Sequence, residues 1–261
     1  MSYPFLFVTI ELCQMNLPLL NDLQVVAIDK KESVRFMDRI DTRYLFDKTY
    51  LEEVIQKIRP YYQLIHIEGK RLFQYDTLYF DTPERLFYYQ HLAGKLNRYK
   101  IRSRRQVETN EQYFELKSRN NKSFTRIQRI QLDDLSEDIS GNGRQLLLQN
   151  IPIDVSSLEP AVWIYYHRIM LVNPETRERL TFDLNVWFRW RSQSVAYPNL
   201  VIADVQQEKG NASPFKNLMK EKEIREGGIS KYCLGLASVE PSLRANAIKP
   251  ILTKINRLNK C

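Results

Sequence analysis

The sequence predicts an α+β fold in which an antiparallel β-barrel is flanked by helices. Several segments alternate charged and apolar residues with the period of two that a β-strand imposes. Other segments carry apolar residues at helical spacing. An open sheet would leave the charged strand faces in water, whereas a barrel packed on its outside by helices would enclose them in a polar lumen. Because the charged pattern recurs on several strands, we expect the barrel.

The strongest alternation lies in residues 97–105, which read N-R-Y-K-I-R-S-R-R. As a strand, this segment projects four cations from one face and places Tyr99 and Ile101 on the other. A face of like charges repels itself, so we expect an anionic partner opposite it. For this segment alone, a solvated edge strand protected by its charges is the alternative. The four cations are Arg98, Lys100, Arg102 and Arg104.

Three further segments repeat the pattern, which favours the barrel over the edge strand. Each offers one polar face and one apolar face. Charge of a single sign inside a lumen would focus the electric field on a polyanion. The polar faces are Tyr113, Glu115, Lys117 and Arg119 in the first segment, Tyr166 and Arg168 in the second, and Arg179, Thr181, Asp183 and Asn185 in the third.

The remaining elements follow from apolar spacing and from turn residues. Helices are expected at residues 49–60, 213–226 and 240–258. Residues 120–121 and 173–174 are typical of turns, and the glycine-rich residues 141–143 of a loop. Strands are expected towards the end of residues 34–46 and at residues 75–80, 97–105, 111–118, 125–132, 161–172, 179–190 and 200–206.

Composition and charge indicate a globular chain with anionic partners. The 261 residues are 43% hydrophobic, enough for a substantial core, and the net charge is +8. That charge points to nucleic acid, a membrane surface or phosphate without choosing among them. Cys13, Cys233 and Cys261 form neither a disulfide framework nor a zinc motif, which indicates a reducing compartment.

The chain is expected to form one domain, residues 31–261, behind an N-terminal extension, residues 1–30. The first twelve residues lack the basic start of a signal peptide, and Glu11 interrupts their apolar run. They are expected to be either a poorly ordered extension or a strand of a partner's sheet. No apolar run in the sequence reaches the ~18 residues that a transmembrane helix needs, so we expect a protein that is soluble on its own.

The cations and a few carboxylates define the chemistry that the sequence permits. It contains no glycine-rich phosphate loop, and its three histidines have no catalytic or metal-binding context. Arg and Lys can hold phosphate oxygens, while carboxylates can hold a hard divalent ion that bridges those oxygens. For each carboxylate, an ion pair with its basic neighbours is an equally good alternative. The carboxylates are Asp41, Glu115, Asp183 and Asp204.

Five short motifs, taken in order, resemble the VTC-type polyphosphate polymerase domain of the triphosphate tunnel metalloenzymes. They are R-I-D-T-R-Y at 39–44, Y-F-D-T at 79–82, R-Y-K-I-R-S-R at 98–104, F-E-L-K at 114–117 and S-K-Y-C-L-G at 230–235. The resemblance implies an eight-stranded antiparallel barrel, a tunnel that binds triphosphate or polyphosphate with Mn²⁺ or Mg²⁺. It also implies transfer of the ATP γ-phosphate to a growing polyphosphate chain, with release of ADP.

The resemblance further implies roles for individual residues. Arg102 and Arg104 would hold the nucleotide phosphates, and Lys117 would lie close to the transferred phosphate; these three form the expected catalytic set. Asp204 and Glu115 would bind the metal. The remaining phosphate or nucleotide contacts would come from Arg43, Lys100, Arg129, Tyr166, Arg168, Arg179, Ser230 and Lys231. Arg43 stands where the family usually has lysine, which keeps the charge but changes the geometry.

Three positions depart from the family pattern in ways that bear on catalysis. Asp204 replaces the usual metal-binding glutamate and is one methylene shorter. Gln206 and Ile127 stand where lysines are usual, and fewer cations would weaken phosphate affinity and transition-state stabilisation. If the alignment near Thr125 slips by one residue, Arg126 would compensate in part. A slow or silent tunnel is therefore compatible with the sequence.

The first functional hypothesis is a metal-dependent polyphosphate polymerase that uses ATP. A non-catalytic polyphosphate- or nucleotide-binding module and a tripolyphosphatase on the same barrel are the alternatives. Nucleic acid is disfavoured as a partner, because a stacking platform would show exposed aromatics among the cations. We expect a cytoplasmic protein that reaches a membrane only through a separate membrane-protein partner. The oligomeric state is left open.

Overall fold

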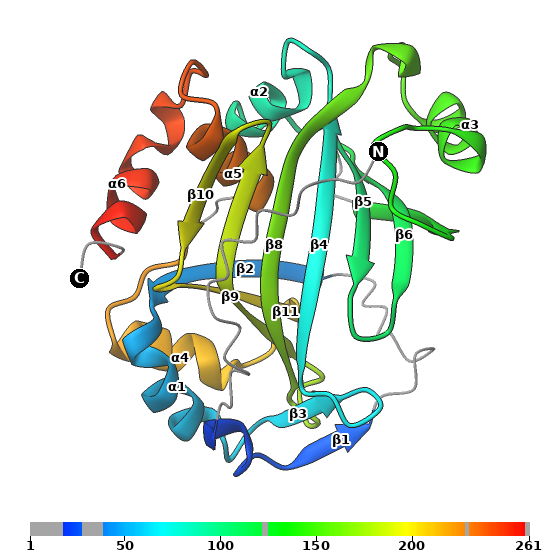
Figure 1. The fold of residues 1–261 in the computed structure, drawn as a ribbon. Helices are drawn as coiled ribbons and strands as arrows, with labels where there is room; N and C mark the ends of the chain where they lie inside the picture. Colours follow the sequence, from blue (N-terminus) through cyan, green and yellow to red (C-terminus); the bar gives the residue numbers. More distant parts are fainter. Residues whose placement is uncertain (1–17, 28–38, 122–124, 228–229, 259–261) are drawn as a thin grey trace.

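Eight strands lie side by side in one curled antiparallel sheet, in the order β2-β11-β9-β8-β4-β5-β6-β7 (Figure 1). The computed structural model describes residues 18–27, 39–121, 125–227 and 230–258. Together with the helices, this sheet confirms the predicted α+β class. The strands are β2 (Arg39–Asp47), β4 (Leu72–Asp81), β5 (Arg98–Gln106), β6 (Glu111–Arg119), β7 (Thr125–Leu132), β8 (Glu159–Val172), β9 (Arg179–Trp190) and β11 (Leu200–Glu208).

Three shorter strands extend the sheet away from this main path. β10 (Gln193–Tyr197) pairs with β9, and β3 (Gln63–His66) pairs with β8. β1 (Val25–Ala27) pairs in parallel with β3. Residues 18–27, part of the predicted N-terminal extension, thus pack on the sheet, where Leu20 and Leu23 are buried. The predictions for residues 1–17 lie outside the described residues.

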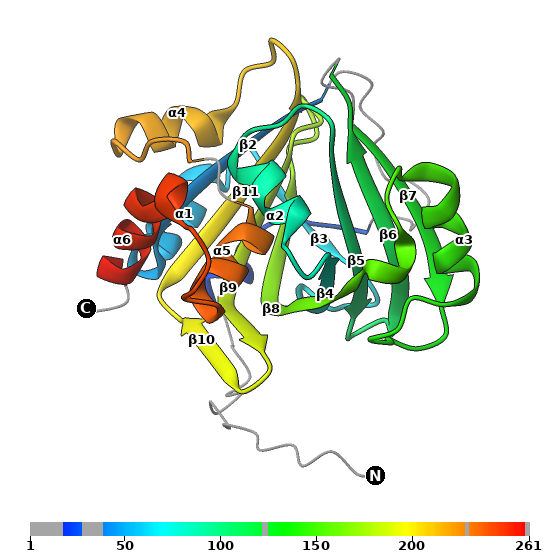
Figure 2. The same ribbon diagram turned by 90° about the horizontal axis from the view of Figure 1, so that it is seen from above.

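Helices cover the sheet on its outside and at one of its ends. α1 (Leu51–Ile58) and α4 (Pro214–Glu221) contact each other and contribute to one apolar core with the outer residues of β2, β9 and β11. α3 (Gly141–Asn150) packs outside β6. α2 (Leu86–Leu92) and α5 (Lys231–Val239) lie over the end of the sheet that faces the viewer in Figure 2. α6 (Lys249–Leu258) is the last helix.

The sheet curls until its two outer strands approach each other. In Figure 2, β2, β11 and β9 lie opposite β5, β6 and β7, with α2 and α5 between them. Lys117 Nζ on β6 lies 3.9 Å from Asp41 Oδ2 on β2, although β2 is the first strand of the order and β6 the last but one. Within the described residues no ladder joins β2 to β7. The predicted barrel is therefore a curled sheet whose seam is bridged by side chains.

Several predicted boundaries and elements need correction. Residues 141–143, predicted as a loop, begin α3, because Gly143 must pass closely over the ring of Phe114; an added Cβ would lie 3.3 Å from that ring. The C-terminal helix begins at Lys249 and not at residue 240. The sequence analysis missed β3, β10, α2 and α5; these elements are short, and tertiary packing outweighs local propensity in such segments.

The regular alternation of β9 is broken at Asn185. This residue has a φ of 50°, and the β8–β9 register shifts between Tyr165 and His167. Asn tolerates the left-handed conformation, and a bulge of this kind changes which face the following residues occupy. The regular alternation predicted for this strand therefore does not hold beyond Asn185. Val186 and Phe188 pack with the apolar cluster around α5.

Candidate functional site

The charged residues predicted from strand alternation lie on one face of the sheet, which we call the inner face. Directly paired residues of antiparallel strands share a face. The pairs run continuously around the sheet from Lys117 opposite Lys100 to Asp204 opposite Arg43. The intervening pairs are Arg102–Glu115, Arg102–Tyr79, Arg104–Thr77, Tyr75–Tyr166 and Arg168–Asp183.

We call the following set of inner-face residues the charged belt. It contains eight cations and four carboxylates, so it carries an excess of positive charge when all are ionised. The cations come from β2, β5, β6, β7, β8 and the start of α5. The members are Arg43, Lys100, Arg102, Arg104, Lys117, Arg129, Arg168 and Lys231, with Asp41, Glu115, Asp183 and Asp204.

Glu115 forms the first centre of the belt and is 1% exposed. Its carboxylate receives Arg102 Nε at 2.6 Å, and the guanidinium groups of Arg104 and Arg129 lie 3.5 and 3.7 Å away. Burial opposes ionisation of this carboxyl, but the three arginines outweigh it and lower its pKa to about 2. Glu115 is therefore ionised at neutral pH and fixes the three arginines in place.

Asp183 is the second centre and is fully buried. Arg168 donates to both of its oxygens, with Nε–Oδ1 at 2.6 Å and Nη2–Oδ2 at 2.9 Å. Lys231, the first residue of α5, forms an ion pair with Oδ2 of the same carboxylate. Burial opposes the ionisation of Asp183, and the two cations overcome this and lower its pKa.

Asp204 is the third centre, on the strand next to Asp183. Arg43 Nε and Nη2 lie 2.8 and 2.7 Å from Asp204 Oδ1, and Lys231 Nζ lies 3.8 Å from Oδ2. Lys231 thus links the second and third centres. Although burial opposes ionisation, Arg43 and Lys231 hold the pKa of Asp204 well below its ordinary value.

Lys100 differs from the other cations of the belt. In the described part of the chain its ammonium meets no carboxylate and instead donates to Ser230 Oγ at 2.9 Å. Its neighbours include Lys117, Arg43 and Arg102. Burial, and then these like charges, lower the pKa of Lys100 to about 7, although the Cys233 thiol acts in the opposite direction.

Aromatic rings support the arginine side chains of the belt. The Tyr75 ring stacks on Tyr166 with a centroid separation of 5.3 Å. Arg104 and Arg168 lie over the Tyr75 ring at 5.0 and 5.3 Å. Cation–π contacts of this kind hold a guanidinium without neutralising its charge. They therefore position the cations while leaving their N–H groups directed at a ligand or a carboxylate.

The structure brings almost all of the predicted phosphate-binding residues together. Arg179 lies on the same face by register, opposite Gln206 and one row beyond Asp204. Ser230 and Lys231 stand at the N-terminal end of α5. The register also resolves the alignment near Thr125. Ile127 pairs with Lys117 on the inner face, whereas Arg126 pairs with Ser118 on the other face and cannot replace the missing lysine.

Sequence reasoning missed two hydroxyls on the inner face. Thr77 is 1% exposed and lies between Arg104 and Ile164, and Thr181 is 4% exposed and lies opposite Asp204. Neither Oγ1 has a hydrogen-bond partner within the described structure. Buried polar groups are almost always paired, so these two hydroxyls are exceptions with unused hydrogen-bonding capacity. The alternation of β9 placed Thr181 on the polar face, but no sequence signal distinguished either residue.

Two of the family-like motifs prove to position the belt through backbone contacts. Asp81 of Y-F-D-T accepts the backbone N–H groups of Thr82, Phe87 and Tyr88, which fixes the start of α2. It also accepts the hydroxyl of Tyr232 in S-K-Y-C-L-G. Asp81 thereby ties α5 to β4 and holds Lys231 against the second and third centres.

The predicted metal ligands occupy unequal environments. Glu115 faces three guanidinium groups, an arrangement that favours the ion-pair role. Asp204 lies opposite Thr181, whose hydroxyl has no partner within the described structure. Lys231 forms ion pairs with both Asp204 and Asp183. The described residues contain no group of three or more His, Cys, Asp or Glu side chains that could hold a metal. Mg²⁺ is commonly held by one or two carboxylates together with substrate phosphates, and the oxygens near Asp204 fit that mode.

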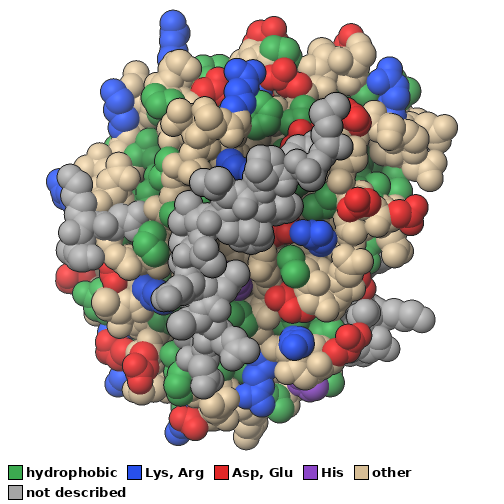
Figure 3. Space-filling view, viewed as in Figure 1, with side chains coloured by type: hydrophobic (Ala, Val, Ile, Leu, Met, Phe, Trp, Pro, Cys, Tyr) green, Lys and Arg blue, Asp and Glu red, His purple; other side chains and the backbone are tan. Residues whose placement is uncertain are grey.

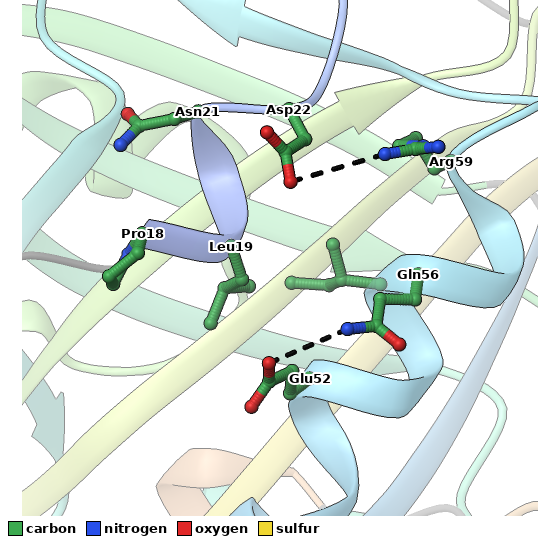
Figure 4. Close-up of a pocket in the computed structure, with 8 residues that line it drawn as sticks. Pro18, Leu19, Asn21, Asp22, Glu52, Gln56 and Arg59 are labelled. Atoms are coloured by element: carbon green, nitrogen blue, oxygen red, sulfur yellow. Dashed lines mark hydrogen bonds and ion pairs between the residues drawn. The ribbon is translucent and has the colours of Figure 1, made fainter.

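A hollow on the outer surface, away from the belt, lacks the excess of cations found there. It has a volume of about 350 Å³ and lies between α1 and residues 18–22 (Figure 4). Arg59 Nη1 and Asp22 Oδ2 are 4.0 Å apart at its rim, and Gln56 donates to Glu52 at 3.5 Å. With one cation against two carboxylates, this hollow is not suited to a polyanion. On the part of the surface visible in Figure 3, cations and carboxylates are intermixed as well.

Comparison with known families identifies the family of the chain. The model of the VTC domain family matches residues 38–240, well over half of the chain. The chain belongs to the VTC domain family. This membership confirms the resemblance inferred from the five motifs. A search of curated proteins found no match.

Solved structures with a similar fold come from plants, bacteria and archaea. A putative adenylyl cyclase from Hippeastrum, described as having dominant triphosphatase activity, has a TM-score of 0.49 at 14% identity; the match covers 80% of this chain and 98% of that one. A putative adenylate cyclase from Bacillus halodurans has a TM-score of 0.47 at 15% identity, covering 74% and 94%. The PH1819 protein from Pyrococcus horikoshii has a TM-score of 0.42 at 12% identity, covering 76% and 97%. At these identities the likeness concerns the fold alone.

None of the described helices is long and apolar enough to cross a membrane.

Proposed function

We propose that the charged belt binds the phosphates of ATP and of inorganic polyphosphate, and that this VTC-family chain transfers the γ-phosphoryl group of ATP to polyphosphate. The observation that carries the proposal is the belt itself: eight cations, seven of them paired with four carboxylates, on one face of a curled sheet. Pre-positioned cations stabilise the charge that develops during phosphoryl transfer without having to reorganise.

The residues of the belt divide the work. Arg104 reaches Glu115 through Nη2 alone, so its other N–H groups match phosphate oxygens. Arg102 directs Nε and Nη2 at Glu115 and donates Nη1 to Tyr79, so it supplies positive charge beside them. Lys117 and Lys100, on adjacent strands, supply two ammonium groups; that of Lys117 is partly exposed near Asp41, whereas that of Lys100 is buried beside Ser230. Arg43, Arg168 and Lys231 complete the ring around a bound phosphate chain.

Mn²⁺ or Mg²⁺, held by Asp204 with phosphate oxygens, would neutralise charge on the transferred group. Thr181 and Asp183 are the oxygen-bearing neighbours of Asp204 on β9. For Asp204 to accept a metal, its ion pairs with Arg43 and Lys231 must give way, and incoming phosphates provide both cations with a new partner. We therefore expect metal and phosphate to bind together.

The departures at Ile127 and Gln206 keep a second function open, namely binding of polyphosphate or nucleotide without catalysis. Ile127 lies beside Lys117 on the inner face and is 41% exposed, so a cation is missing at that point of the belt. Turnover separates the two functions. The purified protein should release ADP and form polyphosphate from ATP with Mn²⁺. Release of inorganic phosphate without polymer would instead indicate a triphosphatase.

Binding is tested separately from turnover by thermal unfolding with tripolyphosphate. A ligand that binds only the folded state should raise Tm. Arg104→Ala should reduce this shift, because it deletes a belt cation while Arg102 and Arg129 still pair with Glu115. Lys57→Ala, on the exposed face of α1, is the matched control, and this variant should keep the rise in Tm. Absence of any shift in the native protein would argue against a polyphosphate site.

The metal is tested at Asp204. Asp204→Asn should abolish Mn²⁺-dependent turnover and leave the tripolyphosphate shift largely intact, since ground-state affinity is shared among many cations. Restoring the family pattern with Asp204→Glu, Gln206→Lys and Ile127→Lys together should raise the rate. A slower triple variant would show that these three residues are adapted to this protein.

For localisation we propose a cytoplasmic protein that would meet a membrane through a separate partner.

A further inference from the structure

We propose that the outward face of α6 binds the surface of an anionic phospholipid bilayer through its lysine and arginine side chains, without inserting into the bilayer. This contact is independent of the charged belt. It would give the chain a membrane contact of its own, in addition to any separate partner. The observations that carry it are the distribution of positive charge along the chain and the placement of α6.

Positive charge is concentrated at the C-terminal end of the sequence. Residues 241–261 contain five cations and no aspartate or glutamate, so this short stretch accounts for five of the net eight positive charges. Clusters of about four to eight such residues on an amphipathic helix are typical of sites for anionic lipid headgroups. The cations are Arg244, Lys249, Lys254, Arg257 and Lys260.

The cations of α6 lie opposite its apolar side. At about 100° per residue, Lys249, Lys254 and Arg257 fall within an arc of about 140°. All three residues are exposed. Since the protein core already covers the apolar side, α6 cannot bury that side in a bilayer, and only electrostatic contact remains. The apolar residues that pack against the core are Ile251, Leu252, Ile255 and Leu258.

These cations are not neutralised in the way that the cations of the belt are. Within the described residues, the side chains of Arg244, Lys249 and Lys254 form no ion pair. The last carboxylate that precedes them in the sequence, Glu240, pairs with Arg85 at 3.1 Å. On the part of the surface visible in Figure 3, by contrast, both signs of charge are intermixed. The excess positive charge of α6 is therefore available to an anionic surface.

The placement of α6 suits a flat and extended partner. The helix lies at the outer edge of the molecule in both views (Figures 1 and 2). Its cations are spread along about 12 Å of helix, from Lys249 to Arg257. Spread cations contact many headgroups of a bilayer at once, whereas a single phosphate group requires cations that converge on one point.

Nucleic acid fits this face less well. Residues 241–261 contain no aromatic residue, so they offer no stacking surface to unpaired bases. Against a bilayer, each lysine or arginine near the surface contributes about a fivefold gain in partitioning, and several together give measurable binding. Because salt screens such exposed charges, the binding should be reversible and should weaken as the salt concentration rises.

Cosedimentation with vesicles tests the inference. The full chain is mixed with vesicles of phosphatidylcholine alone, or with vesicles in which phosphatidylserine replaces one third of that lipid. We expect the native protein to sediment with the anionic vesicles at low salt, to be released at high salt, and to ignore the neutral vesicles. The triple variant Arg244→Gln, Lys249→Gln, Lys254→Gln should lose at least tenfold in partitioning.

A second triple variant is the matched control. Lys57→Gln, Lys70→Gln and Lys209→Gln remove the same charge from exposed positions outside α6 and should leave vesicle binding unchanged. Both variants should keep the native Tm and its rise with tripolyphosphate, which shows that they are folded.

Three results would overturn the inference. The first is a native protein that ignores the anionic vesicles, or an α6 variant that still binds them. The second is an equal loss in both triple variants, which would assign the attraction to the overall charge. The third is binding of single-stranded DNA or long-chain polyphosphate through α6 without binding of any vesicle. None of these results bears on tripolyphosphate binding by the belt, which the rise in Tm tests separately.

Discussion

The surroundings of Thr77 are unfavourable for the stability of the free protein and favourable for phosphate binding. Its hydroxyl is buried between Arg104 and Ile164 and has no partner in the described structure. A buried hydroxyl that lacks a hydrogen bond destabilises the folded state, while a phosphate oxygen that accepted from it would recover that energy. A bound phosphate would therefore supply the hydrogen-bond acceptor that the Thr77 hydroxyl lacks in the free protein.

We predict opposite effects of Thr77→Val on the free and the bound protein. The free energy of unfolding should rise by about 1 kcal/mol, because the methyl group removes an unsatisfied polar atom. Affinity for tripolyphosphate should fall by a similar amount. Chemical denaturation and calorimetric titration measure the two quantities. A variant that is destabilised while binding normally would show that the hydroxyl has a structural partner.

Lys100 should make phosphate binding depend on pH. Only its protonated form attracts an anion, and its pKa is about 7 because burial and neighbouring cations disfavour the charge. Affinity for tripolyphosphate should therefore fall as the pH rises from 6 to 8. Lys100→Met should flatten this part of the profile, and titration of the ligand itself is the same for both proteins. An unchanged profile in Lys100→Met would assign the dependence to another group.

The same group affects the stability of the free protein with the opposite slope. The folded pKa of Lys100 lies below its unfolded value, so between pH 7 and about 10 the unfolded chain binds more protons. Stability should rise with pH in that window, by at most about 1.4 kcal/mol per pH unit.

At the level of elements, α5 performs two tasks. Its first turn contributes Lys231 to the belt, and the rest of the helix fills the apolar end of the sheet. The sequence analysis found the S-K-Y-C-L-G motif but not the helix. Because α5 is buried on most sides, its apolar residues lie on several faces of the helix. Its amphipathic pattern is therefore weak.

Gly235→Ala tests how closely α5 must approach the sheet. The added methyl group would meet the Phe188 ring, so we expect destabilisation by about 1–3 kcal/mol. Tripolyphosphate affinity should fall as well, because Lys231 and Ser230 move with the helix. Thermal unfolding measures the first effect. Adding Phe188→Leu should recover part of the stability, and no recovery would place the strain elsewhere.

At the level of the whole molecule, the belt holds its charge as interlocked ion pairs. The first two centres join strands that follow each other closely in the sequence, whereas the third joins the distant strands β2 and β11 through Arg43 and Asp204. The cations would repel one another without these carboxylates. The net charge of +8 is thus compatible with a folded chain because much of the inner positive charge is locally balanced.

Acid should unfold the protein through these centres. The folded pKa of Glu115 is about 2, below its unfolded value, so its contribution is present above pH 4.5 and is lost as the pH falls towards 2. This carboxyl alone accounts for up to about 3 kcal/mol, and Asp183 and Asp204 act in the same direction. Urea unfolding at pH 5 and pH 3 measures the loss. The loss should be smaller in Glu115→Gln, and an equal loss would contradict the assignment.

The sequence by itself determined which residues share a face. Alternation is local, because successive side chains of a strand must point to opposite sides, so Lys100, Arg102 and Arg104 were grouped correctly before their partners were known. The helix at Leu51–Ile58 and the strands that carry the belt followed from equally local patterns. The bulge at Asn185 was the point at which this reasoning failed.

Only the tertiary structure decided what those faces meet. The order of strands brings Asp204 to Arg43, which is 161 residues away in the sequence. It also seats α5 against Phe188 and Tyr79, which closes one end of the inner face. Such contacts depend on which strands are neighbours and on how far the sheet curls, and no short stretch of sequence contains that information.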